Sequence, residues 1–181
     1  PLVIKPTQGF NGQGVVTVHS REDIMSKLRD ASEAGVPVLA QALVSGAHFN
    51  VDMILVDGRA LPAGITQRLF AERPQHLAIA GIQPAGLSPC EHAQLYSIAE
   101  QSAQAVGLRW GPATVDMIVA NGTPFVLEIS PHLHAVKTTL LSDNDPLRAW
   151  FRFLAGAPDW SSIRPNSAVC AAGYYNVFLD L

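Results

Sequence analysis

The chain has 181 residues, of which 48% are hydrophobic and 15% charged, and its formal net charge is −3. This composition predicts a globular domain with a sizeable core and excludes a disordered chain, while the scattered basic residues argue against a nucleic-acid partner. Two cysteines without metal-ligand spacing favour a cytoplasmic protein over a disulfide scaffold, and the apolar runs are too short to span a membrane.

The first 45 residues predict a hairpin, a helix and a further strand. Apolar segments flank a glycine-rich loop, and a Ser-Arg-Glu-Asp capping pattern starts a helix whose apolar face is Ile24, Leu28 and Ala31. In chain order the expected elements are a strand at 2–4, a loop at 7–14, a strand at 15–18, a helix from 20 to 35 and a strand at 36–39. Because Pro1 already lies in a strand, we expect a fragment whose N-terminal part is missing.

The rest of the chain predicts two more hairpins and two helices. Asp57-Gly58 and Asn121-Gly122 are typical hairpin turns, whereas Ser88-Pro89-Cys90-Glu91 and Asp145-Pro146 are typical helix starts. In chain order we expect a hairpin at 49–65, a loop-rich stretch at 66–87, a helix at 88–107, a hairpin at 113–129, an amphipathic helix at 145–156 whose apolar face is Leu147, Trp150, Phe151 and Leu154, and a β-prone segment at 174–178.

Hairpins interleaved with helices predict an α+β fold with antiparallel sheets and packed helices. Residues 1–156 would form one region, and residues 157–181 a C-terminal extension with a further strand.

The hairpin at 113–129 is the most informative segment, because side chains alternate between the two faces of a strand. Its two apolar sets share a buried face only if the loop has an odd number of residues. The sets are Val115, Met117 and Val119, and Phe125, Leu127 and Ile129. We therefore expect a three-residue loop with Gly122 at positive φ, which places Asp116 and Glu128 together on the other face. A divalent cation between these carboxylates is one interpretation, and a solvated acidic face is the other.

A second candidate site lies near the N-terminus, where Lys5 ends a strand before three glycines, Gly9, Gly12 and Gly14. Glycines allow backbone N–H groups to approach a polyphosphate, and the lysine adds a positive charge. The spacing matches neither the Walker A pattern nor the dinucleotide fingerprint. A flexible hairpin turn after an ordinary lysine is the alternative interpretation.

In combination these motifs resemble the ATP-grasp superfamily, in the C-terminal part of its domain and in its carboxylate–amine ligase branch. Lys5-Pro6 and residues 9–14 resemble the strand end and glycine-rich flap of that family, and residues 38–46 look like its hinge strand. Asp116 and residues 128–131 resemble its metal-binding hairpin, and the stretch at 84–111 is similar to the ligase branch. The motifs occur in the family's order over residues 1–156.

The resemblance implies an ATP-grasp fold and a ligase that joins a carboxylate to an amine through an acyl phosphate, with ATP and Mg²⁺, or Mn²⁺ in its place, as cofactors. It implies small-molecule acid and amine substrates and leaves a homodimer open. The implied nucleotide contacts are Lys5, Gly9, Gly12, Gly14, Gln41, Ala42, Val44 and His48; the metal contacts are Asp116, Glu128 and Ser130; and the catalytic contacts are Arg68, His132 and Lys137.

Three residues depart from the family pattern. His48 stands where a Glu usually bonds the ribose, Ser130 where an Asn completes the metal set, and His132 where an Arg often follows. His48 and Arg68 are each read either as ligand-binding or as ordinary polar residues, and His132, His134 and Lys137 as a basic cluster or a solvated loop. A non-catalytic nucleotide-binding or regulatory module is therefore the alternative function. A biotin-dependent carboxylase component is disfavoured, since His132 replaces the expected Arg.

Overall fold

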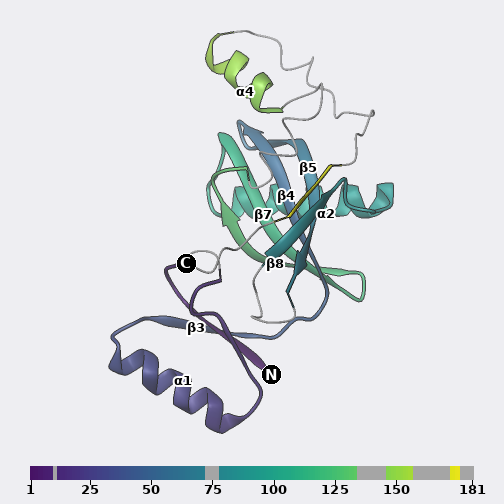
Figure 1. Cartoon of the computed structure of the whole chain (residues 1–181). Helices are drawn as coiled ribbons and strands as arrows, with labels where there is room; N and C mark the ends of the chain where they lie inside the picture. The colour runs from purple at the N-terminus through teal and green to yellow at the C-terminus, as the bar shows by residue number, and fades with distance from the viewer. Residues whose placement is uncertain (10–11, 72–77, 134–145, 157–171, 176–181) are drawn as a thin grey trace. The chain divides into compact units, whose positions relative to one another are not determined.

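The computed structural model describes residues 1–9, 12–71, 78–133, 146–156 and 172–175 (Figure 1). Two antiparallel sheets and their helices confirm the predicted α+β class, and the chain divides into two compact units. The first unit comprises Pro1–Ser45 and Phe70–Ile79, and the second comprises Gly46–Leu69 and Ala80–Leu181. Among the described helices, none combines the length and apolar content that crossing a bilayer requires.

The first unit contains a three-stranded sheet in the order β2-β1-β3. Its elements are β1 (Leu2–Pro6), β2 (Val16–Val18), α1 (Arg21–Glu33) and β3 (Val38–Ala42). The predicted hairpin is confirmed, because β1 pairs antiparallel with β2. The prediction of a strand starting at residue 36 was wrong. The Val36 N–H donates to the Ala31 carbonyl and completes the C-terminal cap of α1 at Gly35, so Val36 cannot yet join a strand.

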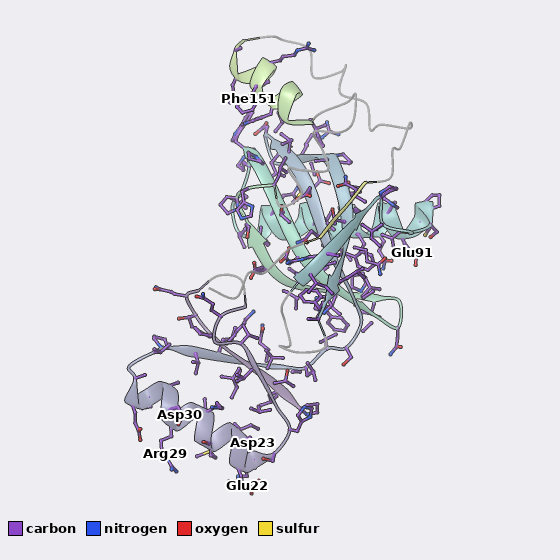
Figure 2. All side chains as sticks on the ribbon, viewed as in Figure 1. Glu22, Asp23, Arg29, Asp30, Glu91 and Phe151 are labelled. Carbon is purple, nitrogen blue, oxygen red and sulfur yellow. The ribbon has the colours of Figure 1, made fainter. Side chains whose placement is uncertain are left out.

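Helix α1 begins where the sequence predicts. The Ser20 hydroxyl accepts a hydrogen bond from the Asp23 backbone N–H at 3.0 Å, which satisfies one of the free donors of the first turn. The apolar face of α1 is only partly covered: no residue of the helix is fully buried, Ile24 and Ala31 are half-buried, and Leu28 is 37% exposed. The labelled polar side chains of α1 in Figure 2 are Glu22, Asp23, Arg29 and Asp30.

The second unit contains a sheet in the order β8-β7-β4-β5-β6-β9. Its strands are β4 (Ala47–Val56), β5 (Arg59–Phe70), β6 (Ala78–Gln83), β7 (Gly111–Ala120), β8 (Thr123–Ser130) and β9 (Ala172–Tyr175). Strand β4 is central and runs antiparallel to both β5 and β7. The prediction of a loop-rich stretch at 66–87 was wrong for residues 66–70 and 78–83, which form strands, whereas residues 84–87 lie outside the helices and strands as expected. Strand β5 continues to Phe70 because β4 already begins at Ala47. The backbone groups at the start of β4 pair with those of Gln67 and Arg68.

Helix α2 (Pro89–Ala105) covers one face of this sheet (Figure 1). The predicted capping box at its start is present: the Ser88 N–H donates to Glu91 Oε2 at 2.8 Å, and the Glu91 N–H donates to Ser88 Oγ at 3.3 Å. The helix is anchored by a leucine and two small alanines that allow close approach to the strands. The main core residues of the helix and the sheet are Leu95, Ala99, Ala103, Val51, Met53, Val115 and Met117.

The turn between β7 and β8 has two residues, so the expected three-residue loop was wrong. Ala120 pairs directly with Thr123, and Asn121 and Gly122 take positive φ values of 50° and 76°. The odd residue lies instead in a β-bulge between Asp116 and Met117, where Leu127 has no partner in the register. This bulge restores the predicted parity for Glu128 and Ile129 and keeps Asp116 opposite Glu128. The expected shared face was wrong for Phe125, which lies on the turn side of the bulge, pairs with Ile118 and is 42% exposed.

The amphipathic helix predicted at 145–156 is present as α4 (Pro146–Leu154), and part of its apolar face is exposed. Phe151, labelled in Figure 2, is 63% exposed, and Leu154 is also exposed. The described packing of this helix is aromatic: the Phe153 ring stacks on Trp110 and on Trp150 at centroid distances of 6.1 and 5.7 Å. Strand β9 overlaps the expected β-prone segment at residues 174–175, begins two residues before it and pairs with β6, whereas residues 176–178 lie outside the described residues.

Replacing Gly46 with alanine should destabilise the second unit. A Cβ at this position would lie 2.7 Å from the Val119 carbonyl carbon and closer still to its oxygen, so a backbone would have to move. We expect Gly46→Ala to lower the free energy of unfolding by ~1–3 kcal/mol in a denaturant titration. Gly86→Ala is the matched control, because a Cβ there meets nothing within 4 Å. Equal stabilities of the two variants would contradict this expectation.

Candidate metal and nucleotide site

One face of the six-stranded sheet is polar at its centre, on the side opposite α2. Directly paired residues share a face, and residues two apart along a strand return to it, so the register defines this surface. We call it the polar face. Its members are His48, Asn50 and Asp52 on β4, Thr66 and Arg68 on β5, Thr114 and Asp116 on β7, and Glu128 and Ser130 on β8.

Asp116 and Glu128 lie directly opposite each other on β7 and β8, the juxtaposition that strand parity predicts. The pKa of the Asp116 carboxyl is raised to about 6, chiefly because burial disfavours its charged form and next because Glu128 is close. Arg68 and Asn50 oppose this rise. The pair therefore favours a positive partner more strongly than an ordinary surface acid does.

Two side chains from neighbouring strands hold Asp116. The Arg68 guanidinium on β5 places Nη1 3.8 Å from Asp116 Oδ2, with both side chains mostly buried. On the strand between them, the Asn50 amide Nδ2 donates a hydrogen bond to Asp116 Oδ1. The structure thus brings the predicted residue Arg68 to the predicted metal ligand Asp116, across the whole width of β4.

A further buried network lies one row along the sheet. The Thr114 hydroxyl is within hydrogen-bond distance of the Asp52 carboxylate and lies 2.7 Å from the His132 carbonyl oxygen. Asp52 and Thr114 are almost completely buried. This network ties the chain that follows β8 to the centre of the sheet, and so it helps to place Ser130, which pairs with Thr114.

Sequence reasoning missed Asn50, Asp52 and Thr114. Two polar residues, Asn50 and Asp52, are spaced by two in a strand whose other residues, apart from His48, are apolar, and this spacing puts them on one face. The same parity that singled out Asp116 and Glu128 would have found them. Their connection to Asp116 is visible only from the pairing of β4 with β7.

The other predicted residues of the second unit have different positions. His48 pairs with Arg68 and shares its face, and Ser130 lies next to Glu128 at the end of β8. His132 is exposed, and its carbonyl oxygen accepts the hydrogen bond from the Thr114 hydroxyl. Lys137 and His134 lie outside the described residues.

In the first unit, the register places Lys5 and Gln41 on the same face of the three-stranded sheet, because Lys5 pairs with Leu39 and Val3 with Gln41. Ala42 points to the opposite face, and Val44 follows the end of β3.

The glycine loop between β1 and β2 needs its glycines at two positions. Gly12 and Gly14 have φ values of 72° and 71°, which other residues rarely adopt. A Cβ on Gly14 would also lie 2.8 Å from the Pro6 ring. Gly14 therefore lies close against the end of β1, the strand that carries Lys5, and Gly9 follows that strand.

The donor set of the polar face suits a hard cation. Asp116, Glu128 and Ser130 offer two carboxylates and a hydroxyl, all oxygen ligands of the kind that Mg²⁺ takes together with substrate phosphates. Within the described ranges, no group of three or more His, Cys, Asp or Glu side chains is arranged to hold a metal ion. Asp116, Glu128 and Ser130 therefore suit a magnesium ion that takes its remaining ligands from a phosphate.

Comparison with known proteins identifies relatives of this chain. Residues 1–136 match the ATP-grasp domain. Carnosine synthase 1 of Gallus gallus is 30% identical over 125 residues, which cover 69% of this chain and 12% of that protein. D-alanine–D-alanine ligase of Cupriavidus taiwanensis is 26% identical over 143 residues, 72% of this chain and 42% of that protein. The chain thus spans less than half the length of these relatives.

Solved structures show the same fold. The L-amino acid ligase of Bacillus licheniformis superposes with a TM-score of 0.75 at 20% identity, over 97% of this chain and 44% of the other. The biotin carboxylase domain of the Hydrogenobacter thermophilus 2-oxoglutarate carboxylase, solved with MgADP and bicarbonate, gives 0.69 at 17% identity, over 86% of this chain and 36% of the other. The predicted ATP-grasp fold and the predicted relationship to carboxylate–amine ligases are confirmed. With its match to the ATP-grasp domain over residues 1–136, the chain belongs to the ATP-grasp family.

Proposed function

We propose that this chain is the nucleotide- and metal-binding part of an ATP-dependent ligase that joins a carboxylate to an amine. The observation that carries the proposal is the direct pairing of Asp116 with Glu128 on a buried polar face that also contains Arg68. Membership of the ATP-grasp family supports ATP as the nucleotide, since solved relatives include a D-alanine–D-alanine ligase complexed with ATP.

The proposed reaction has two steps. An oxygen of the substrate carboxylate attacks the γ-phosphorus of ATP, the bond to the β-phosphate oxygen breaks, and ADP leaves. The amine then attacks the carbonyl carbon of the acyl phosphate, phosphate leaves and the amine loses a proton. Both steps gather negative charge on phosphate oxygens, so catalysis consists mainly of positioning and charge neutralisation.

The residues of this chain have distinct proposed roles. Asp116, Glu128 and Ser130 would hold magnesium, which neutralises phosphate charge when it is bound. Arg68 would hold the anionic acid or acyl phosphate, since a guanidinium binds carboxylates and phosphates through paired hydrogen bonds. His132 and Lys137 are proposed as further cationic groups.

Nucleotide contacts are proposed for the first unit and for His48. Lys5 would bind the α- and β-phosphates, and the backbone of Gly9, Gly12 and Gly14 the γ-phosphate. Gln41, Ala42 and Val44 would surround the adenine, two of them mostly through backbone atoms, and His48 would bond the ribose. The shared sheet face of Lys5 and Gln41 supports this assignment for those two residues.

ATP turnover by the full-length protein tests the proposal. We expect release of ADP and phosphate that depends on both an acid and an amine from a panel of amino acids and small carboxylic acids. Mixtures that lack the acid, the amine or magnesium are the controls. Binding of ATP without turnover on any acid–amine pair would contradict the ligase.

A non-catalytic nucleotide-binding module is the second candidate, and Ser130 and His132 favour it because they depart from the family pattern. Replacing Ser130 with Asn restores the amide oxygen that usually completes the metal set. A ligase should keep or gain turnover in Ser130→Asn, whereas a binding module should show no new chemistry. The measurement is ADP release at saturating substrates, compared with the unchanged protein.

A further inference from the structure

Asn50 occupies a central position on the polar face. It lies on β4, where its direct partners are Thr66 on β5 and Asp116 on β7. Its side chain has 0% exposure, and its chain neighbours Phe49 and Val51 belong to the hydrophobic core on the other face. A fully buried amide in such a strand needs polar partners, because burial removes its hydrogen bonds to water.

The two carboxylate oxygens of Asp116 have different partners, and Asn50 contacts only one of them. Asn50 Nδ2 donates to Oδ1, whereas Oδ2 is the oxygen that faces Arg68, at 3.8 Å from Nη1. The neutral Asn50 amide therefore fixes Oδ1 of the Asp116 carboxylate, and Oδ2 of the same carboxylate is directed toward the positive charge of Arg68. Glu128 lies on the far side of Asp116, directly opposite it on β8.

The oxygen of the same amide is a second, independent observation. Asn50 Oδ1 is buried and has no hydrogen-bond partner among the described residues. An unsatisfied buried acceptor disfavours folding, so an amide kept in this place for stability alone would be a poor choice. A role in the function of the site explains why an asparagine and not an apolar residue stands here.

We propose that Asn50 is a positioning residue of the metal site, which holds Asp116 through Oδ1 and so sets the direction of Oδ2, the oxygen that would bind the cation. This inference rests on the proposed function of Asp116 and Glu128 as metal ligands. It matters more in this chain than in a relative with asparagine at the position of Ser130, because a hydroxyl is a weaker third ligand. Partners that orient a metal ligand are needed nearly as much as the ligand itself.

The test measures metal binding and does not depend on turnover. Mn²⁺ would be titrated into the full-length protein with ADP and followed by electron paramagnetic resonance, for the unchanged protein, Asn50→Ala and Asn50→Leu. We expect the Mn²⁺ dissociation constant to rise ~10–100-fold in both variants. ADP binding in the presence of EDTA should change less than about twofold, because Asn50 acts through Asp116.

Thr66→Val is the matched control. Thr66 is equally buried, lies on the same face in the same row and donates to Gln83 at 3.3 Å instead of to Asp116. Its Mn²⁺ affinity should stay within about twofold of the unchanged protein, because it orients no metal ligand. This control separates a loss of orientation from a general effect of removing a polar group from the polar face.

The outcomes are distinct. Unchanged Mn²⁺ affinity in the folded Asn50 variants would overturn the inference, as would an equal loss in Thr66→Val. Absence of Mn²⁺ binding in the unchanged protein would overturn the proposed metal site itself. If neither Asn50→Ala nor Asn50→Leu folds, Asn50→Ser serves the same test. Its side chain keeps a polar group but is one bond too short to replace the amide, so the same loss of affinity is expected.

Discussion

Asp116→Asn and Glu128→Gln should each lower the rate of ATP turnover at least ~100-fold while the protein stays folded. Each change removes one of two paired carboxylates but keeps the size of the side chain. With one negative charge lost, the site should hold magnesium more weakly and leave the charge on the phosphates less neutralised. The measurement is ADP release at saturating acid, amine and ATP over a range of magnesium concentrations.

Asp30→Asn is the control for this prediction. Asp30 is an exposed carboxylate on α1 that pairs with Lys27 at 3.2 Å, so its removal changes the net charge equally but touches no site residue. Turnover should stay within about twofold, because a solvent-exposed ion pair contributes little. If Glu128→Gln retained nearly full turnover at low magnesium, Asp116 and Glu128 would not act as a metal-binding pair.

The stability of the metal-free protein should fall as the pH rises from about 4 to about 7. The pKa of Asp116 is raised from 3.8 to about 6, so over this range the folded protein binds a proton that the unfolded chain has already released. The stabilising contribution is complete below the unfolded pKa and is lost as the pH passes the folded pKa. The difference in pKa corresponds to ~3 kcal/mol at full effect.

Asp116→Asn should remove this dependence, because an amide stays neutral throughout. We expect the variant to be more stable than the unchanged protein at pH 7, by ~1–3 kcal/mol, and similar to it at pH 4. Urea titrations in EDTA at several pH values measure both proteins. Parallel stability curves would show that burial and Glu128 do not raise the pKa of Asp116. A variant that is both more stable and inactive would indicate that the acidic pair is kept for its function.

Local signals in the sequence were sufficient where a few neighbouring residues decide the structure. The caps at Ser20 and Ser88 each use a side chain and a backbone N–H three residues apart, so they form in almost any tertiary context. Asn121 and Gly122 form the tight turn that this dipeptide favours, since both tolerate positive φ. These elements were predictable because their partners are close in the chain.

Where the partner of a residue is distant, local patterns misled. The strand extension to Phe70 depends on β4 offering backbone groups to residues such as Gln67 and Arg68, whose polar character suggested a loop. The exposed apolar residues of α1 and α4 had the periodicity of buried faces, yet in each case only part of the face is covered. Periodicity shows that a helix has an apolar side, but it does not show what covers that side.

The candidate site combines both kinds of information. The alternation of side chains along the strands was enough to predict that Asp116 lies opposite Glu128. The structure achieves this with a bulge at Leu127 and not with the predicted three-residue loop. A three-residue loop, or a two-residue turn combined with a bulge, places these two acids on one face, and the structure has the turn and the bulge. Asn50 and Arg68 come from strands about 50 to 65 residues earlier, so their contacts with Asp116 depend on how β4 and β5 pair in the sheet.

By itself, the sequence determined the family of this chain, the positions of its caps and turns, and the presence of two acids on one face of a hairpin. These properties depend on residue types and on short spacings along the chain, and both can be read directly from the sequence. Only the tertiary structure decided which groups surround Asp116, because cross-strand pairing brings together side chains whose separation in the chain carries no signal. The burial that raises the pKa of Asp116 likewise results from the whole sheet, and no single segment of the chain contains it.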